Sequence, residues 1–105
     1  MATLENLKTW IERDIRPRRW TVAIIEDADR SFHCEVTAGR HVFTIAANAD
    51  DYYLGCTCRT RFNARGETHP RFADLPDGSL NTETWEAIVT AMKRLEIRPY
   101  RGHGL

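Results

Sequence analysis

The chain has 105 residues, which is enough for one domain with its own hydrophobic core, and no second domain is needed. Fifteen basic and fifteen acidic side chains cancel, so no global field draws the protein to DNA, to an acidic membrane or to a basic partner. We expect no secretory signal and no membrane-spanning segment, because no apolar run is long enough. Three cysteines in a chain without an export signal favour reduced thiols and a cytoplasmic location.

The N-terminal segment predicts a helix. Thr3 can act as its cap, and Pro17 stops it shortly after Ile15. Its apolar residues recur at intervals of three and four, so the helix should pack by one face. These residues are Leu4, Leu7, Trp10 and Ile11.

Four strands are expected to follow on short connections. Residues 19–26, 31–37, 41–47 and 52–61 are rich in β-branched and aromatic side chains and are separated by turn residues. Consecutive strands on short turns pair with one another, so we expect an antiparallel meander with one face against the helices. The residues expected on that covered face are Val22, Ile24, Phe32, Cys34, Val36, Leu54, Cys56 and Cys58, together with Phe43 and Ile45, whose phase against Val42 and Thr44 is ambiguous.

The rest of the chain predicts a long loop and a second helix. Residues 62–80 show no period, and such loops are more often functional than their neighbours. Asn81 can cap a C-terminal helix, and residues 99–105 should form a loose tail. The apolar stripe of this helix consists of Trp85, Ile88, Val89, Met92 and Leu95. The expected fold is therefore one α+β domain over residues 1–105, in the order α-β-β-β-β-α, with both helices on one face of the sheet.

Alternation in the strands predicts a binding surface on the opposite face. Tyrosine and arginine, the residue types that most often dominate protein interfaces, point outward from the fourth strand and continue into the adjoining loop. Two polar residues of the second strand share this face. The predicted partner-binding residues are Tyr53, Arg59, Arg61, Arg65, Arg71, His33, Glu35 and Thr57.

Charge is distributed unevenly although it sums to zero. The segments 13–19, 59–71 and 93–101 each hold four basic side chains against one acidic side chain. The acidic residues gather in the predicted turns at 26–29 and 50–51. If these turns lie at one end of the sheet, the molecule is electrostatically polar.

Cys56 and Cys58 invite a zinc interpretation, with Cys34 and one of His33, His41 and His69 as further ligands. Residues two apart on a strand lie roughly 6.5 Å apart along it and could share one ion only with distortion. Three buried thiols that serve as small apolar side chains are the better interpretation. We therefore expect no metal and no other cofactor.

The leading functional hypothesis is a non-enzymatic binding protein that acts stoichiometrically on a protein partner, as an inhibitor or adaptor. No phosphate-binding glycine loop, paired metal histidines on a helix or nucleophile elbow is present in the sequence. Small phage-encoded inhibitors of bacterial defence complexes have this kind of size and composition, which is an analogy of class without a motif. Three alternatives stay open: single-stranded nucleic acid bound by the same face, an enzyme that uses His69 and the carboxylates of the loop 62–80, and a homodimer through the open face.

Overall fold

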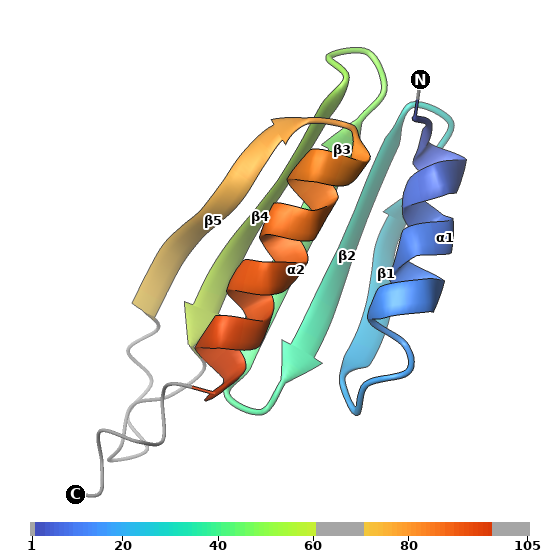
Figure 1. The fold of residues 1–105 in the computed structure, drawn as a ribbon. Helices are drawn as coiled ribbons and strands as arrows, with labels where there is room; N and C mark the ends of the chain where they lie inside the picture. Colours follow the sequence, from blue (N-terminus) through green and yellow to red (C-terminus); the bar gives the residue numbers. More distant parts are fainter. Residues whose placement is uncertain (1, 61–70, 98–105) are drawn as a thin grey trace, which may run out of the picture.

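The computed structural model describes residues 2–60 and 71–97, which form two helices and a five-stranded sheet (Figure 1). The sheet order is β1-β2-β3-β4-β5, and every neighbouring pair is antiparallel. The predicted class, an α+β meander with a helix before it and a helix after it, is confirmed. The elements are α1 (Leu4–Asp14), β1 (Thr21–Asp27), β2 (Ser31–Ala38), β3 (His41–Asn48), β4 (Tyr53–Thr60), β5 (Arg71–Ser79) and α2 (Thr82–Ile97).

The prediction of four strands is wrong by one. β5 occupies residues 71–79 of the segment predicted to be a loop, and it pairs along its length with β4. Pro76 and Gly78 break the alternation by which a strand is recognised, but proline is tolerated on an edge strand, and β5 is an edge. The remainder of the predicted loop and the predicted tail lie outside the described residues.

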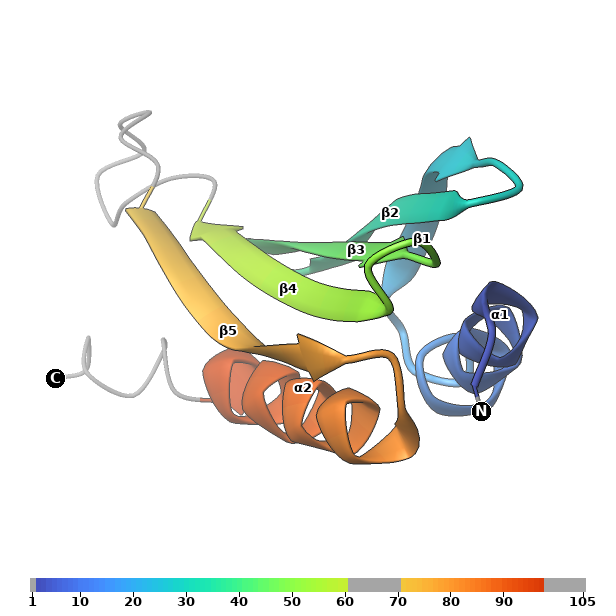
Figure 2. The ribbon, with the colours of Figure 1, turned by 90° about the horizontal axis from the view of Figure 1, so that it is seen from above.

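Both helices lie on the same side of the sheet (Figure 2). α2 packs on β5, β4 and β3, and α1 lies toward the β1 end, so neither of the described helices covers the opposite face. One hydrophobic core fills the space between the helices and the sheet. Its fully buried side chains include Leu7, Phe32, Phe43, Leu54, Trp85, Ile88 and Met92.

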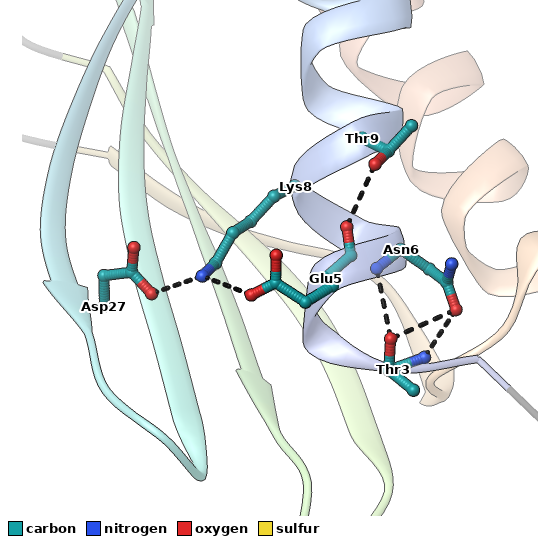
Figure 3. Close-up of polar contacts among 6 residues, drawn as sticks. All are labelled: Thr3, Glu5, Asn6, Lys8, Thr9 and Asp27. Carbon is teal, nitrogen blue, oxygen red and sulfur yellow. Dashed lines mark hydrogen bonds and ion pairs between the residues drawn. The ribbon is translucent and has the colours of Figure 1, made fainter.

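Each helix begins at a residue whose side chain caps it. The Asn6 backbone N–H donates to Thr3 Oγ1 at 3.2 Å, and the Thr3 N–H donates back to Asn6 Oδ1 at 2.8 Å (Figure 3). Asn81 Oδ1 accepts from the backbone N–H of Thr84 at 2.9 Å. Both predicted caps are therefore confirmed.

Neither described helix is long and apolar enough to cross a lipid bilayer.

The expected covered face is confirmed for most of its residues, and β1 is the exception. Ile24 is 48% exposed and Val22 is only partly buried, although both were expected inside the core. β1 is an edge strand, and a register shift between Ile24 and Glu26 bends it. In β3 the ambiguous phase resolves with Phe43 and Ile45 inward.

The turn between β3 and β4 contains a tyrosine with a left-handed backbone. Tyr52 has φ 51°, so it belongs to the turn and not to the strand in which the sequence places it. Its hydroxyl accepts from the Ala2 backbone N–H at 3.3 Å, and its carbonyl accepts from the Leu80 N–H at 3.0 Å. The turn is thereby connected to the segments that precede both helices.

Candidate binding surface

The uncovered face of the sheet is built from alternate residues of neighbouring strands. Glu35, Thr44 and Thr57 stand side by side on β2, β3 and β4. The next row along the strands consists of His33, Ala46 and Gly55. Alternation thus brings the predicted residues His33, Glu35 and Thr57 into two adjacent rows, on a central area of small side chains.

Arg59 lies at one border of this area. Its Nη2 approaches Glu35 Oε2 at 4.0 Å, and because β3 separates the two strands, the side chain reaches across β3. Val42 lies in β3 directly opposite Arg59 and is only 4% exposed, although it points to the uncovered face. The ion pair is long and both side chains are well exposed, so it contributes about 0.5 kcal/mol or less to folding. Arg59 therefore remains available for a stronger partner.

Tyr53 lies at the other border, and its ring is folded along the strand. A Cβ atom at Gly55 would lie 1.9 Å from the Tyr53 hydroxyl oxygen, so the ring covers this glycine. The hydroxyl is 3.4 Å from Asp77 Oδ2 on β5, at the long limit of a hydrogen bond. Tyr53 is nevertheless 38% exposed. The glycine therefore has a specific role, because any side chain in its place would displace the ring.

The described part of this face is not basic. Arg59 shares it with two carboxylates, that of Glu35, 4.0 Å from the guanidinium, and that of Asp77, beside Tyr53. Arg71 begins β5 opposite Thr60 in the backbone register. The predicted residues Arg61 and Arg65, the Arg71 side chain and His69 lie outside what the structure describes, so their part in the site stays a prediction.

The three cysteines lie on the covered face, as expected. Cys34 and Cys56 flank Ile45 in one row, and Cys58 stands opposite Phe43 in another. Burial raises the pKa of Cys34 and of Cys56 to about 12 and that of Cys58 to about 11. These thiols are protonated at neutral pH and are poor nucleophiles. Among residues 2–60 and 71–97, no cluster of three side chains could hold a metal ion.

His41 is the one buried polar side chain found in the core among the described residues. Its Nδ1 lies 3.5 Å from Thr60 Oγ1 and 3.7 Å from Cys58 Sγ, whereas Nε2 has no hydrogen-bond partner among the described atoms. Burial lowers the pKa of His41, and the charge of Arg40 acts in the same direction. A neutral ring inside the core is structural. The alternation that places Phe43 inward also places His41 inward, so the burial of His41 could be predicted from the sequence.

The acidic turns do meet at one end of the sheet. The Ala49 N–H donates to the Arg30 carbonyl at 2.8 Å, and the Arg30 guanidinium pairs with Asp50 at 2.6 Å. In the same region Lys8 bridges Asp27 at 2.6 Å and Glu5 at 2.9 Å (Figure 3). These cations offset the carboxylates locally. A cleft of about 620 Å³ between α1 and the two turns is lined by both signs of charge and selects no single class of ligand.

Comparison with known proteins finds no matching family model, no matching curated protein and no matching solved structure. The functional argument therefore rests on the geometry of the sheet face.

Proposed function

We propose that this chain is a non-enzymatic binding protein that acts by covering part of a protein partner's surface, as an inhibitor or adaptor. The observation that carries the proposal is the arrangement of the uncovered sheet face. A central area of small side chains is bordered by Tyr53 on one side and by Arg59 on the other. Protein interfaces combine such aromatic and arginine anchors with energetically neutral surroundings.

The geometry favours tyrosine as the anchor. The Tyr53 ring is held over Gly55 before any partner arrives, so little conformational entropy remains to be lost on binding. Rigid residues with a large contact area give affinity at low entropic cost. Arg59 contributes a fork of donors whose present partner, Glu35, is 4.0 Å away.

Two features disfavour the alternatives. Single-stranded nucleic acid requires a basic groove, whereas Arg59 on the described part of the face is offset by Glu35 and Asp77. A thiol enzyme is disfavoured because burial keeps the described thiols protonated, and an enzyme that uses His69 has no further support from the described residues. Protein binding is therefore the function that the geometry supports best.

The test begins with capture of the partner from the native host, with and without nuclease treatment. The purified partner is then titrated against Tyr53→Ala and Arg59→Ala. We expect each variant to bind at least about tenfold more weakly, which corresponds to about 1.4 kcal/mol. Arg94→Ala, at an exposed position of α2, is the matched arginine control and should bind like the wild type.

Thermal unfolding of all variants checks that the fold is retained. Wild-type affinity of both Tyr53→Ala and Arg59→Ala would refute the proposed face. A retained partner that is lost on nuclease treatment, with an affinity that falls steeply with salt, would replace the protein partner by single-stranded nucleic acid.

A further inference from the structure

The outer edge of β1 is a second unpartnered surface, separate from the proposed binding face. β1 pairs with β2 on one side, and no element within residues 2–60 and 71–97 pairs with its other side (Figure 1). Ile24 and Ile25 are 48% and 54% exposed, and they are two of the three large apolar side chains that are exposed in the described chain. An exposed apolar edge with unpaired N–H and C=O groups is a template for another strand.

The two edges of the sheet differ in this respect. β5 contains Pro76, which cannot donate a hydrogen bond to an added strand. β1 contains neither proline nor lysine, and its residues 22–25 are all apolar. Of the two edges, β1 is therefore the one suited to strand addition.

We infer that β1 binds the β1 strand of a second copy of this chain, antiparallel, in a two-fold dimer with one continuous sheet. A two-fold axis between identical strands uses the same edge of both copies, so the assembly closes at two. This surface differs from the face of Tyr53 and Arg59, and the inference does not depend on the proposed function.

The order of charges along residues 19–29 favours a second copy of this chain as the strand that pairs with β1. Arg19 precedes the strand, an apolar stretch occupies its middle, and Glu26 and Asp27 end it, followed by Asp29 in the turn to β2. In antiparallel self-pairing, the basic start of each copy lies opposite the acidic end of the other. A parallel arrangement would place like charges together.

The match holds for either central register. When two copies pair about Ala23, Arg19 lies opposite the partner's Asp27; when they pair about Ile24, Arg19 lies opposite the partner's Asp29. Asp27 already pairs with Lys8 of its own chain, so we expect the copies to pair about Ile24, with Arg19 opposite the partner's Asp29.

A groove beside the strand adds apolar surface. It has a volume of about 120 Å³, lies between α1 and β1, and is lined in part by Ile11, Ile24 and Phe32. Strand addition would cover Ile24 and the groove together and remove their apolar atoms from water.

The oligomeric state of the full chain tests the inference. We expect wild-type protein to have twice the chain mass in sedimentation equilibrium and native mass spectrometry. Ile25→Lys places a charge at the centre of the interface from each copy and should weaken the dimer at least tenfold. Thr90→Lys, at an exposed position of α2, adds the same charge elsewhere and should leave the dimer intact. Equal unfolding temperatures show that the variants are folded.

A charge exchange identifies the antiparallel pairing. Arg19→Glu alone and Asp29→Arg alone should each dissociate, because like charges then face one another. An equimolar mixture should form a one-to-one heterodimer, since the introduced carboxylate faces the introduced guanidinium and the native pair remains at the other end.

Several results would overturn the inference. These are a monomeric wild type at the highest concentration that stays soluble, a dimer that survives Ile25→Lys, a mixture that stays monomeric, and assembly beyond two copies. A dimer lost in Tyr53→Ala and kept in Ile25→Lys would assign self-association to the open face instead.

Discussion

Phe43 and Thr44 are neighbours in β3, yet they lie in different environments. Phe43 is fully buried on the helix side, with its ring centroid 6.1 Å from that of Trp20. Thr44 stands on the uncovered face between Glu35 and Thr57. Apolar burial is the main source of folding free energy, so the two faces of one sheet should respond differently to substitution. The covered face should control stability, and the uncovered face should control binding.

The thiols of the covered face offer the largest expected effect. At about pH 8 the native thiols of Cys34 and Cys56 should react with a disulfide reagent at least a thousandfold more slowly than an exposed thiol, because reaction requires opening of the core. Thr57→Cys, next to Cys56 but on the other face, supplies the exposed thiol for comparison. Reaction of all thiols at one rate would contradict the two-face description.

Phe43→Ala tests the same comparison by stability. We expect a loss of about 3–5 kcal/mol in the free energy of unfolding, from lost burial and an unfilled cavity. Thr44→Ala, one residue away, should change it by about 0.5 kcal/mol. Urea denaturation measures both, and similar losses for the two variants would refute the assignment of faces.

A hydrogen bond between α1 and α2 should also contribute to the free energy of unfolding. Asp14 Oδ2 accepts from Trp85 Nε1–H at 2.7 Å, and Trp85 is fully buried. Asp14→Ala would leave the indole N–H unsatisfied and should cost about 1–3 kcal/mol. The exposed turn residue Asp51 provides the control, since Asp51→Ala removes a carboxylate without a buried partner.

The Asp14 carboxylate should also make the free energy of unfolding depend on pH in the acid range. The hydrogen bond from Arg13 holds the pKa of Asp14 below its usual value of 3.8, and the Trp85 donor acts in the same direction against the effect of burial. The contribution of Asp14 is therefore complete above pH 3.8 and is lost as the pH falls through the lowered value. Asp14→Asn should lack this part of the acid response, and an unchanged acid profile would contradict it.

His41 should make stability depend on pH in a higher range. Because burial lowers the pKa of His41 below the usual 6.5, the unfolded chain takes up a proton that the folded protein excludes. This contribution is complete above pH 6.5 and is lost progressively as the pH falls below it. Urea denaturation between about pH 7.5 and about pH 5 should show a steeper decline for wild type than for His41→Gln. Equal slopes would mean that His41 titrates alike in both states.

Gly55→Ala should have the smallest effect on stability and a clear effect on binding. The added Cβ meets the far end of the exposed Tyr53 side chain, which can be displaced toward solvent, so the free energy of unfolding should change by less than about 1 kcal/mol. Displacement of the ring should lower partner affinity toward that of Tyr53→Ala. Ala46→Ser, in the same row, enlarges the neighbouring side chain and serves as control. Wild-type affinity of Gly55→Ala would remove the role assigned to the held ring.

The local parts of the fold were predictable from the sequence. Thr3 and Asn81 carry their capping signals within a few residues, and the alternation of β2 needs no partner to be recognised. β5 was not predictable, because Pro76 and Gly78 resemble loop residues until pairing with β4 gives them a place. The exposure of Ile24 depends on where the sheet ends, which no local pattern encodes.

In the candidate binding surface, too, some features could be predicted from the sequence and others could not. Period-two alternation places His33, Glu35 and Thr57 on one face, and the structure brings them together. The contact of the Tyr53 hydroxyl with Asp77 could not be foreseen, because Asp77 belongs to the unexpected fifth strand.

Tyr52 has a consequence for the order of folding. A bulky residue with a left-handed backbone costs about 1 kcal/mol or more, so the turn between β3 and β4 is a poor nucleus on its own. The contacts that compensate come from Ala2, fifty positions away, and from Leu80, in the segment before α2. The central hairpin should therefore become stable only when the segments that contain Ala2 and Leu80 have docked. An excised β3–β4 peptide would then stay unstructured, and the domain would fold as a single cooperative unit.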